Sequence, residues 1–330
     1  MLGQGASAQS VPDADVVVVL NADERDETVR RLAEALAAIY LYPSVGERYA
    51  EALRVALKAN AYDGVHTRQD LADRLRADLQ TVAPDAHLRL LPNDLIEDHS
   101  SPEIVSGTVL PEGIEAMDMM GSDRGVAYLR FTAFPHDPRT APAARAFLLD
   151  NAGSTSAVII DARALPGGGI EVMDAILPLF FDKRTVLVSM DTRAAAENES
   201  PFTEGATLIR RAGPAGFVTY DHVVMPDKQE RRLRKVPLYY LISSETASAG
   251  EHLALALKRT GRGTLIGETT RGANHFGALV PVGSRLTAFV PVGRTYDPDT
   301  GCDWEGEGIE PDVALPAEAA LEEALRLLNP

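Results

Sequence analysis

Apolar residues recur at helical spacing in the first quarter of the chain. In the segment 25–41 they stand three or four positions apart, at Val29, Leu32, Leu36 and Ile39. Two further segments, 48–60 and 67–82, repeat the pattern, and turn residues separate the three. Because this spacing puts the apolar side chains on one face of a helix, the sequence predicts a three-helix bundle between Asp23 and about Asp85.

From residue 87 onward, short apolar runs typical of strands alternate with amphipathic segments typical of helices. The expected strands are residues 87–92, 125–131, 157–161, 185–190, 216–224, 238–242 and 264–266. The expected helices are residues 142–152, 171–180 and 249–259. Residues 279–296 are expected to form a two-stranded hairpin, and the polar segment 191–213 an exposed loop lying over a site. This order predicts an α/β fold with a parallel-rich sheet and flanking helices.

The length of the chain bears on its domain organisation. With 330 residues, it exceeds a single typical core, so two packed units are expected. We divide it into a flexible N-terminal segment at 1–22, a helical bundle at 23–86 and an α/β core at 87–330.

Charge and composition exclude several classes of function. The chain has 32 basic against 48 acidic residues, a formal net charge of −16, which argues against nucleic acid or an anionic membrane as a partner. Its longest apolar runs are about strand length, so no integral membrane segment is expected. A single cysteine, Cys302, excludes an internal disulfide and a paired-cysteine metal site. We expect no metal and no cofactor.

The first ten residues contain a small-residue pattern, Ala6-Ser7-Ala8, that is typical of a signal-peptide cleavage site. The charged and apolar regions of a full signal peptide are missing. This pattern favours a periplasmic or secreted protein, with the cytoplasm as the alternative.

A serine stands between a predicted strand and a predicted helix. The apolar run 238–242 ends in small polar residues, and Ser248 then falls at the first turn of the helix 249–259. Free N–H groups and the positive end of the helix dipole at such a position can stabilise an oxyanion beside a nucleophile. Ser248 and Glu251 also form the S-x-x-E pattern of a capping box, in which the serine has only a structural role. Both interpretations remain open on this local pattern.

Three other segments contain candidate chemistry. A strand ending at Asp161 leads into three glycines, 167–169, whose backbone N–H groups could hold a carbonyl oxygen, although the loop lacks the dinucleotide fingerprint. His87 stands at the boundary between the two predicted units, and Glu305 lies among glycines before a Pro-Asp turn. The ordinary alternatives are a tight turn, a surface histidine and an acidic loop.

Four motifs in this order carry a family resemblance: IIDARALPGG, SSETASAGEHLALAL, GRGTLIGETTRGANH and DWEGEGIEPDV. Together with the helical N-terminal unit, they resemble the C-terminal processing (tail-specific) serine peptidase superfamily over about residues 25 to 315. The branch most similar is that of interphotoreceptor retinoid-binding protein and the tricorn protease core. The resemblance implies a crotonase-like α/β core and cleavage of peptides through an acyl-enzyme.

The resemblance also implies roles for individual residues. Ser248 falls on the nucleophile of the family, and the backbone N–H groups of Ala249 and of Gly168 or Gly167 fall on the oxyanion donors. The lysine base of the processing peptidases is absent, because Ala273 occupies its place.

A tricorn-like arrangement would supply a different base. His87 falls on the position of its histidine and Glu305 on that of its glutamate, while Ala86 replaces an additional serine. A neutral imidazole can take the serine proton, and a carboxylate can stabilise the imidazolium. His275, which closes the glycine turn, is the alternative base and ranks second, and His252, one turn after Ser248, ranks third.

We therefore predict a serine-type peptidase acting on peptides or unfolded protein segments. The interval between His87 and the strand at Val126 is too short for the PDZ module that many processing peptidases insert. The alternatives are a non-catalytic binding protein for an apolar ligand on the same fold, and an esterase or acyl transferase with the same nucleophile. Assembly into a homo-oligomer is left open.

Overall fold

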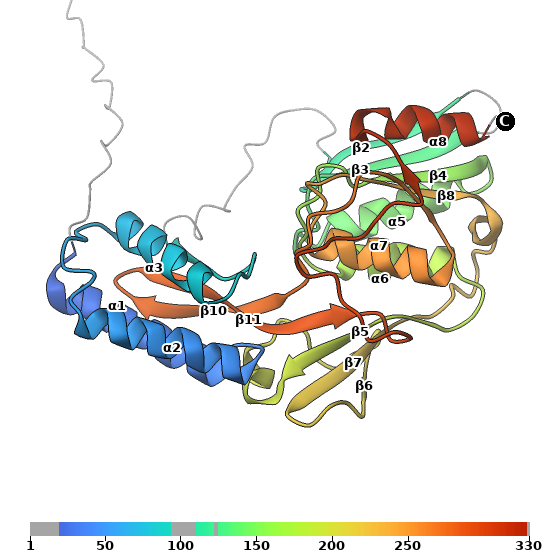
Figure 1. Ribbon diagram of the computed structural model, residues 1–330. Coiled ribbons are helices and arrows are strands. Elements are labelled where there is room, and N and C mark those ends of the chain that lie inside the picture. Colours follow the sequence, from blue (N-terminus) through green and yellow to red (C-terminus); the bar gives the residue numbers. More distant parts are fainter. Residues whose placement is uncertain (1–19, 94–109, 122–124, 329–330) are drawn as a thin grey trace, which may run out of the picture.

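Two β-sheets with helices packed on them form the part of the chain that the computed structural model describes, residues 20–93, 110–121 and 125–328 (Figure 1). The fold is therefore mixed α/β, as the alternation of apolar patterns predicts. The prediction for residues 1–22 falls almost entirely outside the described residues, as does the Ala6-Ser7-Ala8 pattern. No helix among the described residues is long and apolar enough to cross a membrane.

Three helices occupy the predicted N-terminal region: α1 (Ala22–Ile39), α2 (Pro43–Lys58) and α3 (Arg68–Val82). Their starts are set by local chemistry. The Asn21 side chain accepts the Glu24 N–H at 2.9 Å while Glu24 accepts the Asn21 N–H at 3.2 Å, which forms a capping box. At the start of α3 the Thr67 hydroxyl accepts the Asp70 N–H at 3.1 Å, without a reciprocal bond. Pro43 begins α2. Proline has no N–H, and an N–H in the first turn of a helix would have no partner within the helix, so no hydrogen bond is lost there.

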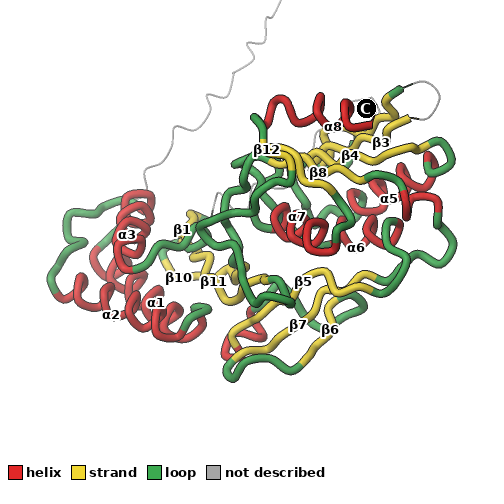
Figure 2. Tube along the Cα trace, turned by 45° about the vertical axis from the view of Figure 1, so that its right-hand side comes forward, coloured by secondary structure: helices red, strands yellow, loops and turns green. Residues whose placement is uncertain are grey.

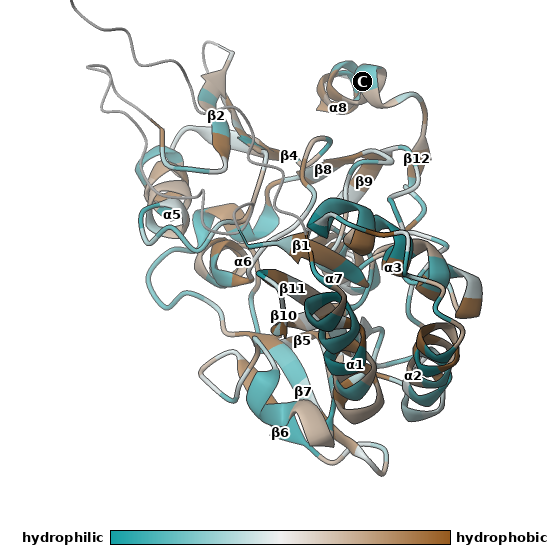
Figure 3. Cartoon of the chain, turned by 90° about the vertical axis from the view of Figure 1, so that its left-hand side faces the viewer, coloured by the Kyte–Doolittle hydropathy of each residue, from teal (hydrophilic) through white to brown (hydrophobic). Residues whose placement is uncertain are grey.

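The apolar faces of these helices are buried against the antiparallel sheet. Leu32, Leu36 and Leu53 pack in one cluster with Leu286 and Val290 of the hairpin described below. Each of these side chains is almost completely removed from water, and full burial of one aliphatic side chain stabilises by roughly 1.5–3 kcal/mol. In Figure 3 the three helices carry both teal and brown stretches, as expected of amphipathic helices.

The first sheet has the strand order β12-β9-β8-β4-β3-β2, and its neighbours are parallel except for β2 with β3. Its strands are β2 (Ile114–Met120), β3 (Gly125–Phe131), β4 (Thr155–Asp161), β8 (Leu238–Ile242), β9 (Thr264–Gly267) and β12 (Val313–Ala314). The sequence predicts four of these strands; β2 and the two-residue β12 are too weakly patterned to be found.

Both faces of this parallel sheet are covered, which explains why its strands are apolar at nearly every position. Alternate residues of β8 point to opposite sides: Tyr240 joins the large central core, and Tyr239 joins a smaller cluster. Helices α5 (Thr140–Asn151), α6 (Glu171–Ile176) and α7 (Ala249–Thr260) pack on the first face, and α8 (Ala320–Leu328) packs on the second (Figure 2). The sequence analysis does not predict α8.

The second sheet is antiparallel, with the order β1-β11-β5-β7-β6 and β10 paired to β11. Its strands are β1 (Arg89–Pro92), β5 (Thr185–Arg193), β6 (Leu208–Arg211), β7 (Phe217–Val224), β10 (Phe276–Gly283) and β11 (Leu286–Tyr296). The hairpin expected at 279–296 is present. The prediction of one parallel-rich sheet is therefore incomplete, because the strands divide between two sheets. A short apolar run predicts a strand but does not show which sheet the strand joins.

Residues 191–213 are only partly a loop. The segment contains the end of β5, a 3-10 helix (Ala194–Glu199) and the strand β6, which lies at the edge of the antiparallel sheet. Several of its other residues, including Pro201 and Phe202, line the cavity described below. The predicted position over a site is therefore correct, whereas the predicted absence of secondary structure is wrong. The helix expected at 171–180 also changes to a 3-10 turn (Leu177–Leu179), where Pro178 falls.

Candidate active site

Ser248 lies between β8 and α7 in a strained backbone conformation. Its φ and ψ angles are 50° and −116°, a combination that costs a residue with a side chain on the order of 1–3 kcal/mol and persists only where the surroundings enforce it. The surroundings here are two acceptors of the Ser248 N–H: the carbonyl oxygen of Ala273 at 3.1 Å and the carboxylate of Glu251 at 2.9 Å. Such strained strand-to-helix turns are typical of exposed nucleophiles.

Glu251 is the residue that organises this turn. Its fully buried carboxylate accepts the N–H groups of Ser248, Gly272 and Ala273 and the hydroxyl of Thr270 at 2.6–2.9 Å. The capping box predicted from the sequence is present. A capping hydroxyl accepts an N–H and keeps its own hydrogen, so the structural and the nucleophilic interpretations of Ser248 are compatible.

The glycine loop lies directly against the serine. A Cβ atom at Gly167 would stand 2.8 Å from the Ser248 Cβ atom and 3.2 Å from the Ala249 nitrogen. Gly168 has a φ of +132°, and a Cβ there would stand 1.9 Å from the Phe134 carbonyl oxygen. Within the described ranges, the N–H groups of Gly168 and Ala249 donate to no other residue. Two unpaired backbone donors therefore lie close to Ser248.

A cavity of about 710 Å³ brings most of the predicted residues together. Its lining includes Ser248, Ala249, Gly168, His87 and His275. Glu305 and Gly167 lie just behind this lining: Glu305 follows Trp304, which lines the cavity, and Gly167 contacts Ser248. Residues as far apart in the sequence as His87 and Trp304 thus border one cavity.

The side chain of His87 lines this cavity in its neutral form. Its Nδ1 atom is buried and has no hydrogen-bond partner, and its ring lies 5.9 Å from that of Phe289. Burial lowers the pKa of His87 to about 4, even though the nearby Asp85 carboxylate favours the charged form. The imidazole therefore has a free lone pair at neutral pH.

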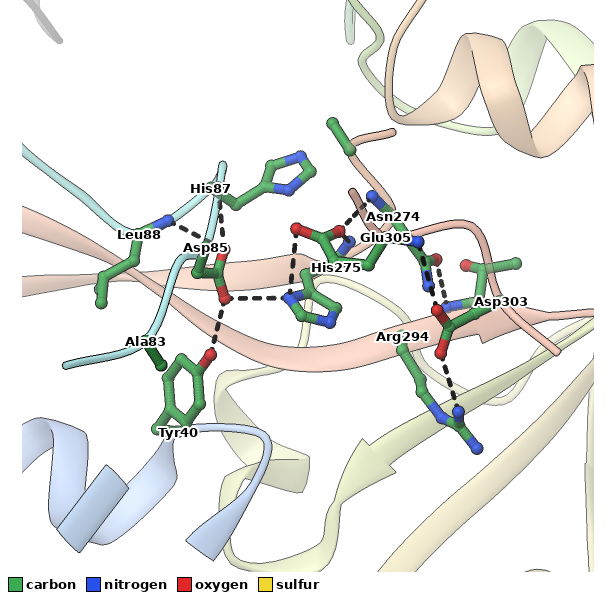
Figure 4. A network of polar contacts seen from close by, with 12 residues as sticks. Tyr40, Ala83, Asp85, His87, Leu88, Asn274, His275, Arg294, Asp303 and Glu305 are labelled. Carbon is green, nitrogen blue, oxygen red and sulfur yellow. Dashed lines mark hydrogen bonds and ion pairs between the residues drawn. The ribbon is translucent and has the colours of Figure 1, made fainter. Parts of the chain in front are cut away.

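Asp85 is a buried carboxylate that the sequence analysis does not identify (Figure 4). One oxygen accepts the backbone N–H groups of His87 and Leu88, and the other accepts the Tyr40 hydroxyl at 2.7 Å and His275 Nδ1 at 2.9 Å. Although burial raises it, the hydrogen bonds from His275 and Tyr40 hold the pKa of Asp85 below its ordinary value. The available signal is its place two positions before His87.

His275 and Asp85 form an Asp–His pair of the kind that orients a catalytic imidazole. Burial lowers the pKa of His275, but the Asp85 hydrogen bond and charge, with Glu305 and Asp303, outweigh it and raise the pKa above its ordinary value. Because Nδ1 donates to Asp85, the lone pair of neutral His275 is on Nε2. Figure 4 shows the ring of His87 directed away from this pair.

Glu305 supports the turn that carries His275. One oxygen accepts the Asn274 N–H at 2.7 Å, and the other lies 3.9 Å from His275 Nδ1. Burial raises the pKa of Glu305, partly opposed by the charge of His275. The glutamate that the sequence analysis assigns to His87 therefore has its hydrogen bonds with the turn that carries the alternative base.

Asp85, His87 and Glu305 also have the spacing of a metal site, with one ligand atom of each within 4.8 Å of the others. Both oxygens of Asp85 already accept two hydrogen bonds each, so an ion would have to displace existing partners. This donor set favours the hydrogen-bonded arrangement, and the metal-free site expected from the sequence stays a prediction.

The fold and the site together define a class: mixed α/β proteins with a serine in a strained strand–helix turn, facing a glycine loop and buried imidazoles. Residues 125–315 match the model of peptidase family S41, and residues 13–120 match that of the N-terminal domain of this family in eukaryotic IRBP. The chain belongs to peptidase family S41. The family resemblance predicted from the four motifs is therefore confirmed.

Curated relatives have names that agree with this family. The carboxyl-terminal-processing protease of Picosynechococcus sp. is 26% identical over 193 residues, which cover 58% of this chain and 40% of the relative. The chloroplastic carboxyl-terminal-processing peptidase 1 of Arabidopsis thaliana is 34% identical over 125 residues, which cover 37% of this chain and 24% of the relative. The chain thus spans less than half the length of these relatives.

Solved structures share the fold at low sequence identity. The photosystem II D1 C-terminal processing protease has a TM-score of 0.58 and 16% identity, with 94% of this chain and 98% of that chain covered. A lipoprotein from Streptococcus agalactiae has a TM-score of 0.57 and 12% identity, with 94% of this chain and 97% of that chain covered. The tricorn protease has a TM-score of 0.50 and 11% identity, with 93% of this chain and 36% of that chain covered.

Proposed function

We propose that this chain is a serine-type peptidase that cleaves peptides through an acyl-enzyme on Ser248. The observation that carries the proposal is the single cavity bordered by a strained serine, a glycine loop with unpaired N–H groups and a neutral buried histidine. The family membership of the chain supports it. The parallel sheet with α5, α6 and α7 on one face supports the crotonase-like core that the resemblance implies.

The proposed reaction begins when Ser248 Oγ attacks the scissile carbonyl carbon and His87 takes the hydroxyl proton. The N–H groups of Ala249 and of Gly168, or its neighbour Gly167, then stabilise the oxyanion. The leaving amine receives the proton as the C–N bond breaks, and water later hydrolyses the acyl-enzyme. Glu305, next to His87 and the 274–275 turn, stabilises the positive charge that the imidazole carries between these steps.

His275 is the alternative base, and Asp85 supports it. The Asp85–His275 pair has the hydrogen bond that fixes an imidazole in one tautomer, whereas His87 has no such partner on Nδ1. Asp85 is within reach of both histidines. In either case one of these two imidazoles deprotonates Ser248.

Two other functions share this fold and site. A carrier of apolar ligands would use the apolar part of the lining, such as Phe202 and Phe276, but it would not need a buried Asp–His pair. An esterase or acyl transferase would use the same residues on another acyl group. The buried titratable groups favour hydrolysis, and peptide cleavage separates a peptidase from an esterase.

The wild-type chain provides the direct test of the proposal. A fluorophosphonate probe is expected to label it in a one-to-one ratio, and peptide mapping by mass spectrometry is expected to place the adduct on Ser248. A denatured sample should not react, because the unfolded serine lacks its base and its oxyanion donors. Labelling that is absent, or that falls on another residue, would overturn the proposed function.

The pH dependence of activity is expected to identify the base. A general base acts in its neutral form, so activity through His87 should persist down to pH values near 4, where its pKa lies. Activity through His275 should instead fall once the pH drops through a value above 6.5, since its pKa is raised from there. The measurement is kcat/KM for an activated ester from pH 4 to 9.

Variants connect this profile to the residues. If His87 is the base, His87→Gln lowers activity by about 10²–10⁴-fold. His275→Gln should then show the same dependence of kcat/KM on pH as the wild type at acidic pH. His66→Gln changes an exposed histidine of the helical region and serves as the matched control. An inflection above pH 6.5 that disappears in His275→Gln would contradict the assignment of His87.

A further inference from the structure

A second chain of imidazoles reaches the same cavity from another part of the fold. His252 Nε2 lies 2.8 Å from His222 Nδ1, and His222 Nε2 lies 2.8 Å from an oxygen of Asp174. His222 is completely buried and His252 is 4% exposed. The three residues come from β7, α7 and α6, so the chain is assembled by the tertiary fold. We call Asp174, His222 and His252 the histidine relay.

The carboxylate determines where the protons of the relay are. An ionised carboxylate only accepts hydrogen bonds, so His222 must donate from Nε2 to Asp174. Neutral His222 then has its lone pair on Nδ1, and His252 must donate to it from Nε2. The remaining nitrogen of His252, Nδ1, is therefore left with a lone pair.

That lone pair is available to the cavity beside Ser248. His252 lies one helical turn after Ser248, and its backbone N–H donates to the Ser248 carbonyl oxygen at 2.9 Å. Both residues line the cavity, and Nδ1 of His252 has no hydrogen-bond partner among the described residues. Burial and the neighbouring His222 hold the pKa of His252 well below its ordinary value, so the ring is neutral.

One end of the relay is closed by the protein, and the other end is open to the cavity. The far end of the relay is satisfied, since the other oxygen of Asp174 accepts the Thr207 hydroxyl at 2.9 Å. Nδ1 of His252 is not sealed in the protein interior, unlike the unpaired Nδ1 of His87, so a water or a bound group in the cavity can donate a hydrogen bond to it. The open end of the relay is thus available to a group that donates a hydrogen bond.

We propose that the histidine relay accepts the proton of the water that hydrolyses the acyl-enzyme, an inference that rests on the proposed function of Ser248. The water oxygen forms a bond to the acyl carbon as its O–H bond breaks and the proton joins His252 Nδ1. The proton on His252 Nε2 moves to His222 Nδ1, which leaves an imidazolium beside Asp174. When the acyl–Oγ bond breaks, the transfers reverse and Ser248 Oγ regains a proton.

Two steps of the reaction then depend on different histidines, and kinetics can separate them. His252→Gln is expected to be labelled by a fluorophosphonate within about threefold of the wild-type rate, because labelling requires only the base of Ser248. Turnover of a p-nitrophenyl ester should fall by about 10²-fold, the lower end of the range for general-base catalysis. Intact-protein mass spectrometry should show the acyl-enzyme accumulating. Asp174→Asn, at a partly exposed position, should show the same pattern to a smaller extent.

The controls separate failure of the relay from failure of the proposed function. His66→Gln should behave as the wild type, and thermal unfolding should verify that each variant folds. Two-bond ¹H–¹⁵N correlations of histidine-labelled wild type should show both His222 and His252 protonated at Nε2, a result that does not depend on activity. Wild-type turnover in His252→Gln, a parallel loss of labelling and turnover, or protonation of His252 at Nδ1 would overturn the relay. Absence of labelling in the wild type would instead overturn the proposed function.

Discussion

Replacing Ser248 by alanine is expected to lower ester and peptide hydrolysis by about 10⁴–10⁶-fold, which leaves only the contribution of binding and the oxyanion donors. The change removes one oxygen atom and keeps the Cβ atom that contacts Gly167. It also leaves the two acceptors of the residue 248 N–H in place, since both bond to the backbone. Steady-state rates of wild type and Ser248→Ala, measured on the same ester and on a denatured protein substrate, check the prediction.

The fold of this variant must be shown to be intact. Its thermal midpoint is expected to fall by no more than a few degrees, because the strained φ of 50° is retained while loss of the capping hydroxyl costs about 0.5–2 kcal/mol. Ser244→Ala is the matched control, since this exposed serine lies in the same connection between β8 and α7. Residual hydrolysis within tenfold of the wild type would show that another nucleophile carries the activity.

Glu251→Ala is expected to lower the free energy of unfolding by about 3–5 kcal/mol, the range for removing one partner of a buried charged network. Four donors lose this carboxylate at once, namely three backbone N–H groups and the Thr270 hydroxyl, although the Ser248 N–H keeps the Ala273 carbonyl oxygen as an acceptor. Each buried donor left without a partner costs about 1–3 kcal/mol, and a cavity remains where the side chain was. Urea unfolding followed by circular dichroism measures the change.

Two substitutions calibrate this effect. Glu251→Gln keeps one carbonyl oxygen but turns an amide toward N–H groups, so an intermediate loss is expected. Glu34→Ala removes an exposed glutamate of α1 and should change stability by less than about 0.5 kcal/mol. A loss below about 1 kcal/mol in Glu251→Ala would mean that water replaces the carboxylate and that the turn does not depend on it.

Local signals in the sequence explain why the helices and the serine turn were predictable. Capping residues and apolar spacing act over a few positions, so α1 to α3 and the Ser248–Glu251 capping box can be found by inspection. The position of Ala273 also follows from motif spacing, and its carbonyl oxygen does accept the Ser248 N–H.

Non-local pairings could not be obtained from the same signals. Nothing near Asp85 indicates that it meets His275, because the two come together only when β10 pairs within the antiparallel sheet beneath α1 to α3. The same holds for Asp174 and His222, whose partners lie on other elements. The only sign of a buried carboxylate in a sequence is an aspartate or glutamate among apolar residues. Several positions in this chain fit that description, so the pattern does not identify the buried ones.

Asp85 connects three segments that are far apart in the chain: Tyr40 after α1, its own turn after α3, and His275 before β10. A displacement of the N-terminal helices by a few tenths of a nanometre would break these contacts without touching the serine. The proton affinity of His275 would then drop, since Asp85 is its strongest favourable contact. The position of the helical region therefore influences the proton affinity of His275, although the region lies outside the serine turn.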